Sequence, residues 1–326
     1  MKLNRWIPVV CLSLLLIPQV SFAWNNVGHM TVAAIAWRQL TDAERAAISA
    51  ILKQHPFYKE MLADGLPAGV NEDEYVFLKA ATWPDLVRPS RPGDRQYKDP
   101  TITRYHHGSW HYTDEAIPLN TATTKPAATQ PAKDLYLPEA LEKMRTEFAA
   151  PDTAAGERAV ALCWIEHLIG DIHQPLHGGS AYTTKYPNGD QGGNLVAVNT
   201  PSGVFNLHSV WDELLGTNND YHVIDFLARD IAADPRCDPK LQPDFAAHKT
   251  LDTWAQESRE AATTFVYVNG YLKTASMKAF QAKEITADEV PALPPMYLQT
   301  AHALARVRVA EAGARLAEAL RTALAK

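Results

Sequence analysis

The feature that most constrains this chain is a pair of polar side chains inside a strongly apolar segment. Residues 157–172 have the pattern of a buried helix, and within them His167 and Asp171 are four positions apart. Side chains at this spacing lie on the same helix face. A buried charge must be paired or must coordinate a metal, yet residues 163–172 contain no Lys or Arg. The fold must therefore bring other polar groups to this face.

Further His and Asp residues are spaced so that they can meet the first pair. Pro175 is expected to end the helix, so that His177 turns back toward Asp171. A second pair with helical spacing stands at His208 and Asp212. Imidazole and carboxylate are the usual zinc ligands where Cys is absent, and one zinc takes about four ligands. There are eight candidate ligands, more than one ion needs, so they predict several catalytic metals. They are His29, Asp85, His111, His167, Asp171, His177, His208 and Asp212.

Single His and Cys residues have other interpretations besides metal binding. A lone His/Asp pair on a helix is more often a salt bridge than a ligand pair. Only the eight candidates taken together indicate a metal site. His173 fits a core residue or one that supports a ligand. His106 and His107 can be assigned to neither class. Cys163 and Cys237 either form a disulfide or, as the apolar surroundings of Cys163 favour, stay free and buried.

The predicted fold class is mainly α, in a single domain. Apolar periodicity predicts helices, and two short alternating runs predict a β-hairpin around residues 199–203. Residues 89–109 and 116–133 are expected to be long loops, the second a flexible surface insertion. The expected helices are 27–39, 46–52, 157–172, 209–215, 251–272 and 295–324, and the expected strands are 194–198 and 204–207.

The first 23 residues have the pattern of a secretory signal peptide. Lys2 and Arg5 precede an apolar run too short for a membrane span, and small residues end at Ala23. We expect cleavage after Ala23 and a domain over 24–326 that is secreted or periplasmic, without stable membrane association. Loss of both leader charges leaves 29 basic and 37 acidic residues, a formal charge of −8. A polyanion is therefore not expected to bind through a carpet of Lys and Arg.

Six motifs, in order along the chain, carry a resemblance to a known family. The chain resembles the zinc-dependent single-strand-specific nucleases of the S1/P1 type, over nearly the whole expected mature chain. The motifs are Trp24-Asn-Asn-Val-Gly-His29, Trp83-Pro-Asp85, Trp110-His-Tyr-Thr-Asp114, His167-Leu-Ile-Gly-Asp171 with its continuation to His177, Gly189-Asp-Gln-Gly-Gly-Asn194 and His208-Ser-Val-Trp-Asp212.

The resemblance implies a helical domain of the phospholipase C/single-strand nuclease type with three zinc ions. Asp85, His111, His167 and Asp171 would hold the first ion. Trp24, through its α-amine and carbonyl oxygen, would hold the second with His29 and a bridging Asp171. His177, His208 and Asp212 would hold the third.

The resemblance also implies an activity and the residues that serve it. A metal-bound hydroxide, oriented by Asp85, attacks phosphorus in single-stranded DNA and RNA to leave 5′-phosphorylated nucleotides, and 3′-nucleotides are further substrates. Arg88 would lie near the scissile phosphate and Asn194 in the cleft. Tyr112, where the family often has Phe, would stack on a base whose edge Asp114 binds.

Two other functions remain open at this stage. A zinc-dependent phospholipase C also starts at a Trp and uses three zinc ions, but its second helical pair usually ends in Glu, where this chain has Asp212. A non-catalytic exported zinc-binding protein would need closed coordination shells. The presence of Arg88, Tyr112 and Asn194 argues against that alternative.

Overall fold

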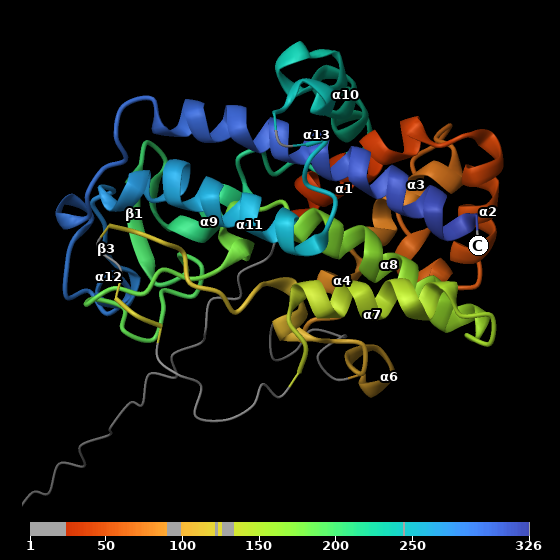
Figure 1. The fold of residues 1–326 in the computed structure, drawn as a ribbon, viewed down its shortest axis with the longest axis horizontal. Coiled ribbons are helices and arrows are strands. Elements are labelled where there is room, and N and C mark those ends of the chain that lie inside the picture. The colour runs from red at the N-terminus through yellow and green to blue at the C-terminus, as the bar shows by residue number, and fades with distance from the viewer. Residues whose placement is uncertain (1–23, 90–98, 121–122, 126–133, 244, 326) are drawn as a thin grey trace, which may run out of the picture.

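The structure is a computed structural model, and it describes residues 24–89, 99–120, 123–125, 134–243 and 245–325. The predicted signal peptide lies outside the described residues, as do most of the predicted insertion and part of the first long loop. In the described part of the chain, helices dominate and one small sheet is present, as predicted (Figure 1). None of the described helices is long and apolar enough to cross a membrane.

Helix α8 (Ala155–Asp171) is the central element of the helical part. Every residue from Ala159 to Asp171 is buried, as expected for a helix that is apolar on all sides. It packs against α1 (Asn26–Gln39), α7 (Leu137–Ala149) and α13 (Tyr297–Leu324) (Figure 1). Further contacts come from α2 (Asp42–Leu52), α3 (Glu72–Ala80) and α4 (Trp83–Leu86). The carboxyl end of α8, which carries His167 and Asp171, is thus enclosed by several helices.

A glycine allows α1 and α13 to approach each other closely. A Cβ atom added at Gly313 would lie 2.5 Å from Ile35 Cγ2 and 3.1 Å from the Val32 carbonyl oxygen. Close packing at this point leaves no room for a side chain. Since His29 lies one turn before Val32 in α1, the contact with α13 fixes the helix that carries His29.

The sheet has three short antiparallel strands in the order β2-β1-β3. β1 (Val196–Thr200) and β2 (Gly203–Asn206) form the predicted hairpin, with Val198 opposite Phe205. β3 (Ala275–Ser276) pairs with the other edge of β1 and was not predicted. At the end of β2, the Asn206 side chain accepts the Ser209 amide and begins α9 (Leu207–Asp212), a helix predicted to begin two residues later and to end three residues later.

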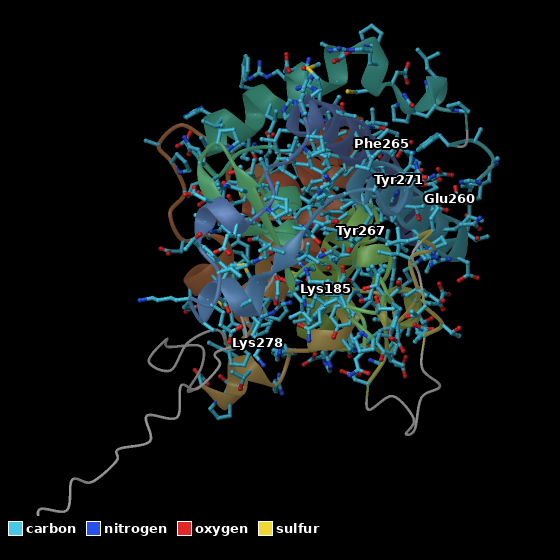
Figure 2. The ribbon with its side chains drawn as sticks, turned by 90° about the vertical axis from the view of Figure 1, so that its left-hand side faces the viewer. Lys185, Glu260, Phe265, Tyr267, Tyr271 and Lys278 are labelled. Atoms are coloured by element: carbon cyan, nitrogen blue, oxygen red, sulfur yellow. The ribbon has the colours of Figure 1, made fainter. Side chains whose placement is uncertain are left out.

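The predicted helix 251–272 is too long. α11 (Leu251–Ala261) continues only as a π-helical turn over Ala262–Val266, followed by a 3-10 turn over Val268–Gly270. Val268 and Asn269 have left-handed φ values of 51° and 55°, which a right-handed helix cannot contain. The break in the helix brings the Tyr267 side chain (Figure 2) to Asp190. The Tyr267 hydroxyl donates a hydrogen bond to the buried Asp190 carboxylate.

The first long loop contains more regular structure than predicted, and the possible disulfide is not formed. The first long loop includes α6 (Pro100–Thr103) and a 3-10 turn over Gly108–His111. Cys163 and Cys237 are both free and buried, so the structure contains no disulfide between them. The remaining helices are α10 (Tyr221–Ala233) and α12 (Met277–Gln281), and the remaining short turns are Tyr58–Leu62, Pro175–Gly178, Pro235–Cys237, Pro239–Leu241 and Ala287–Glu289.

Candidate metal centre

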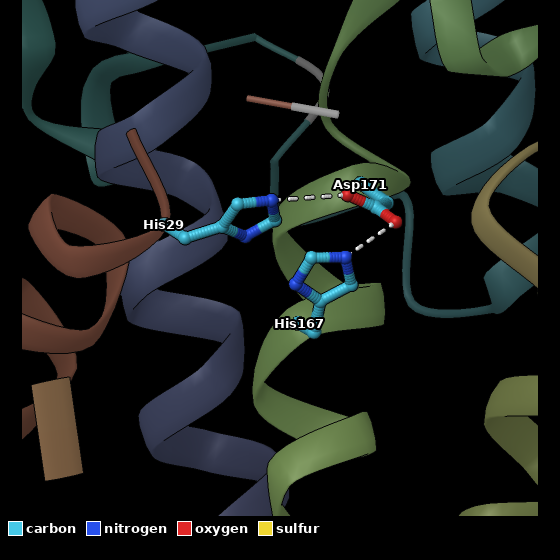
Figure 3. Close-up of side chains that lie close together, drawn as sticks. All are labelled: His29, His167 and Asp171. Atoms are coloured by element: carbon cyan, nitrogen blue, oxygen red, sulfur yellow. Dashed lines mark ion pairs between the residues drawn. The ribbon is translucent and has the colours of Figure 1, made fainter. Parts of the chain in front are cut away.

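The carboxyl end of α8 gathers the first group of candidate ligands. His29 of α1 and His167 of α8 stack their rings with centroids 3.9 Å apart. Asp171 lies beside the nitrogen edges of both rings, with Oδ1 3.3 Å from His29 Nε2 and Oδ2 3.3 Å from His167 Nε2 (Figure 3). All three side chains are buried. The spacing predicted from the sequence is therefore realised, and His29 comes to the pair from a helix about 140 residues earlier.

Asp85 and His111 join this group from two other segments of the chain. Asp85 is in the single turn of α4, which begins at Trp83 and has Pro84 as its second residue, and His111 ends the 3-10 turn after α6. His111 Nδ1 lies 2.9 Å from His167 Nε2 and 3.1 Å from Asp171 Oδ2, and Asp85 Oδ1 lies 3.9 Å from His167 Nε2. Asp171 thus contacts His29 through one oxygen and His111 through the other, a placement suited to a bridging carboxylate.

The second helical pair forms a separate group with His177. The turn Pro175–Gly178 follows α8 as predicted and brings His177 Nε2 to 3.1 Å from His208 Nε2. Asp212, one helical turn after His208 in α9, has Oδ1 3.6 Å from the same nitrogen. These three side chains are also buried. Each of the two His/Asp pairs therefore belongs to a different group.

Backbone carbonyl groups fix the protonation of three of the imidazoles. His167 Nδ1 donates to the Ala81 carbonyl at 2.8 Å, His208 Nδ1 to that of Gly192 at 2.6 Å, and His177 Nδ1 to that of His111. A carbonyl can only accept, so in each neutral ring the proton is on Nδ1 and Nε2 presents a lone pair to the group. Histidines that bind metals are usually held in this way.

Several buried polar atoms at the centre have no hydrogen-bond partner among the described residues. They are Asp85 Oδ1, Asp171 Oδ1, His111 Nε2 and both ring nitrogens of His29. A buried polar atom without a partner costs about 1–3 kcal/mol, so five such atoms in one place need a compensating group. Nitrogen and carboxylate oxygen are ligands for a divalent cation, which satisfies them together. The residues present therefore fit bound metal ions.

The two buried aspartates of the helical pairs have opposite pKa shifts. Burial raises the pKa of Asp171, but His167, His111 and His29 around it outweigh burial and hold that pKa well below its usual value. Burial raises the pKa of Asp212 well above its usual value, and the negative charges of Asp85 and Asp171 add to the effect. A cation beside Asp212 would stabilise its ionised form.

Three sets of side chains have ligand atoms close enough to share an ion. Within each set, the ligand atoms lie within 4.8 Å of one another. In the described residues these sets could hold metal ions, as the sequence predicted. They are His29, His167 and Asp171; Asp85, His111 and His167; and His177, His208 and Asp212.

The start of α1 lies next to the third group. The Asn25 amide donates to the Asp212 carbonyl at 3.3 Å, and the Asn25 side chain caps α1 by accepting the amides of Val27 and Gly28. Trp24 is fully buried, and an added Cβ at Gly28 would lie 2.6 Å from Trp24 Cβ. Trp24 is therefore held tightly in the core, while its predicted coordination through backbone atoms stays a prediction.

A cleft of about 730 Å³ opens beside two of the three sets, those that contain His111 and His177. His111, His177 and His208 reach its wall, and the four other predicted site residues, Arg88, Tyr112, Asp114 and Asn194, also line it. Arg88 Nη2 lies 3.7 Å from Asp85 Oδ1, and the Tyr112 side chain is 46% exposed. The side chains predicted from the sequence to line the site thus lie together, and the three histidines that line the cleft face solvent there.

Two contacts at the site were not predicted. Gln174 is buried; its Nε2 donates to Asp212 Oδ1 at 2.7 Å, while its Oε1 accepts the Leu176 amide. Its place between His173 and Pro175, inside the ligand motif, is the signal that could have identified it. Lys125 forms an ion pair with Asp114, with 2.9 Å between Nζ and Oδ2. Nothing in its Thr- and Pro-rich surroundings distinguishes that lysine.

His173 is a buried core residue, one of the two roles that the sequence left open for it. Its Nδ1 donates to the Ile169 carbonyl, so Nε2 accepts from Arg315 Nη1 at 2.7 Å. Arg308 Nε donates to the His173 carbonyl at 3.2 Å, and Glu257 pairs with both arginines. Burial raises the pKa of Glu257, but the two arginines outweigh it and lower that pKa to about 2. This ion network holds the turn between Asp171 and His177.

Comparison with known proteins gives matches to several endonucleases and to a nuclease, two of them over 60% or more of the chain. Endonuclease 4 of Arabidopsis thaliana is 26% identical over 211 residues, which are 60% of this chain and 56% of that protein. Nuclease S1 of Aspergillus oryzae is 25% identical over 216 residues, 64% of this chain and 59% of that protein. Endonuclease 5 of Arabidopsis thaliana is 44% identical over 55 residues, 17% of this chain and 16% of that protein. The chain thus spans less than two thirds of each of these relatives.

The family comparison covers more of the chain than any of these pairwise matches. The model described as S1/P1 Nuclease matches residues 24–325, a range that begins at Trp24 and includes every candidate ligand. On that match, the chain belongs to the S1/P1 nuclease family.

Proposed function

We propose that this protein is a zinc-dependent nuclease that hydrolyses single-stranded DNA and RNA to 5′-phosphorylated nucleotides and also acts on 3′-nucleotides. The observation that carries the proposal is the arrangement of three buried His/Asp groups, of which His111, His177 and His208 line one open cleft, in a chain of the S1/P1 nuclease family. Ligands that reach a cleft are typical of catalytic sites, whereas structural sites are closed.

Zinc fits the ligand atoms because they are imidazole nitrogens and carboxylate oxygens. In the proposed site, Asp85, His111, His167 and Asp171 hold one ion, and Trp24, His29 and Asp171 hold the second. His177, His208 and Asp212 hold the third. When bound, a close pair of zinc ions lowers the pKa of a water molecule and so supplies a nucleophile near neutral pH.

The side chains of the cleft position the phosphodiester for attack. Asp85 Oδ1 has no hydrogen-bond partner among the described residues, and in the proposed site it orients the attacking water. Arg88, 3.7 Å from that oxygen, is placed to bind the phosphoryl oxygens and to stabilise the negative charge that develops on them. The positive charge of the ions and Arg88 also explains how an acidic chain attracts a polyanion.

Aromatic stacking supports a preference for single strands. Tyr112 presents an exposed ring to the cleft, Asp114 and Asn194 supply polar groups for a base edge, and Lys125 neutralises Asp114. A base can stack on Tyr112 only after it leaves a duplex, which costs a few kcal/mol. Binding of an unpaired strand does not require this free energy, so a single strand is the better substrate.

We further propose that export and cleavage after Ala23 complete the site. A free α-amine has a pKa of about 8 and binds zinc in its neutral form, unlike a peptide nitrogen. Trp24, at the amino end of α1 and five residues before His29, would provide this amine in a single mature domain over 24–326.

A substrate comparison tests the proposed function. Purified, zinc-loaded protein is expected to cleave single-stranded DNA, RNA and a 3′-nucleotide, to act poorly on duplex DNA and to leave phosphatidylcholine intact. Products are identified by chromatography and by their 5′-phosphates. Cleavage of phosphatidylcholine alone would identify a phospholipase instead, and zinc binding without any hydrolysis would identify a non-catalytic protein.

Asp171→Asn is expected to lose both ions of the close pair and nearly all hydrolysis, because one neutral amide replaces a carboxylate shared by two sites. Zinc per chain, measured by elemental analysis, should fall from three to about one. The control is Glu166→Gln on the same helix, since Glu166 is fully buried, has no hydrogen-bond partner among the described residues and belongs to none of the metal groups. Full zinc content in Asp171→Asn would rule out the bridging role.

Tyr112→Ala is expected to weaken nucleotide binding by about 1–3 kcal/mol, the usual contribution of one stacked base. Zinc content should stay unchanged, because the ring reaches no candidate ligand atom needed for the metals. Tyr271→Ala is the matched control: Tyr271 (Figure 2) is 76% exposed and does not line the cleft. Equal affinities of the two variants, measured by calorimetry with a mononucleotide, would remove Tyr112 from the base site.

Extending the mature chain by one residue before Trp24 is expected to weaken one zinc site and to leave two unchanged. The extension converts the α-amine into an amide, which is a poor ligand. Mass spectrometry establishes the first residue of the secreted protein, and metal titration compares the mature and extended chains. The same three affinities in both chains would contradict the role of the Trp24 amine.

A further inference from the structure

The neighbouring residues His106 and His107, which the sequence left undecided, have different positions in the structure. His107 stacks on Trp110 with ring centroids 3.7 Å apart, and its Nδ1 lies 3.0 Å from Asp134 Oδ2. These contacts explain His107 as a packing residue outside the cleft. His106 is instead a half-buried part of the cleft wall, in the same hollow as Arg88 and His111.

The surroundings of His106 fix its charge and its tautomer. Burial, together with the positive charge of Arg88, lowers the pKa of His106 to about 4, so the ring is neutral near pH 7. Its Nδ1 is buried and has no hydrogen-bond partner among the described residues. An N–H buried without an acceptor is costly, which favours the tautomer with the single proton on Nε2.

The Nε2 edge of His106 is left uncovered by a glycine. A Cβ atom added at Gly108 would lie 3.5 Å from His106 Nε2 and 3.6 Å from Cε1, in ordinary contact. Gly108 also lines the cleft, so with no side chain at this position the Nε2 edge stays open to a ligand there. A neutral N–H donor next to a guanidinium adds to anion binding without repelling the cation.

We propose that His106 is a second phosphate-binding residue, which donates its Nε2–H to a non-bridging oxygen of the phosphate group held by Arg88. This inference rests on the proposed function, because it names a further contact of the same substrate. It assigns no proton transfer to His106 and makes it a substrate-binding residue that acts with Arg88.

The test compares binding of inorganic phosphate to zinc-loaded chains by calorimetry. His106→Leu is expected to weaken phosphate binding about ten-fold, as for loss of one hydrogen bond to an anion. His106→Gln keeps an N–H donor and should stay within about three-fold of the unmodified protein, while His107→Leu serves as the control with unchanged affinity. Zinc content should be the same in all four proteins, and KM for a single-stranded oligonucleotide should rise in His106→Leu only.

Two results would overturn the inference: unchanged phosphate affinity in His106→Leu, or an equal loss in His106→Gln. If His106→Leu does not fold, a ten-fold loss in His106→Gln decides against the donor role and a retained affinity supports it. Phosphate binding needs no hydrolysis, so the comparison still decides on His106 if the unmodified protein cleaves no nucleic acid. In that case the proposed function fails separately.

Discussion

The structure depends on one buried carboxylate, that of Asp171, and on the imidazoles that surround it. Its two oxygens lie 3.1–3.3 Å from nitrogens of His29, His111 and His167, with no solvent access. These residues reach Asp171 from three separate parts of the chain, so the helices that carry them must pack to fixed positions. Gly313 allows α13 to hold α1, and the buried ion network around His173 holds the turn that leads to His177.

Bound cations would account for features that are otherwise unfavourable. Carboxylates and imidazoles are buried together, five of their atoms have no partner in the described part of the chain, and Asp212 and Asp171 have opposite pKa shifts. Carbonyl groups hold the Nδ1 protons of His167, His177 and His208, so that their Nε2 lone pairs face inward before any ion binds. Such preorganised ligands, open to a cleft on one side, suit catalysis better than structural support.

Much of the candidate site could be predicted because its signals are local. The spacing of His167 and Asp171, and of His208 and Asp212, depends only on helix geometry, and burial follows from the apolar residues around the first pair. The end of the predicted helix 251–272 could not be predicted. Val268, Asn269 and Gly270 have left-handed φ values, and distant contacts such as Tyr267 with Asp190 stabilise the chain at this point. β3 likewise depends on its pairing with β1, which lies far away in the sequence. The ion pair of Lys125 with Asp114 and the stacking of His107 on Trp110 join residues that are closer in the sequence, but no local pattern distinguishes them.

The central claim is that this chain holds three zinc ions at the places defined by its buried His and Asp residues. The most direct measurement is anomalous X-ray scattering from crystals of the purified protein, recorded on both sides of the zinc absorption edge. The account predicts three peaks: two that share Asp171, and one between His177, His208 and Asp212. A single peak, peaks away from these residues, or a signal at the edge of another metal would contradict it.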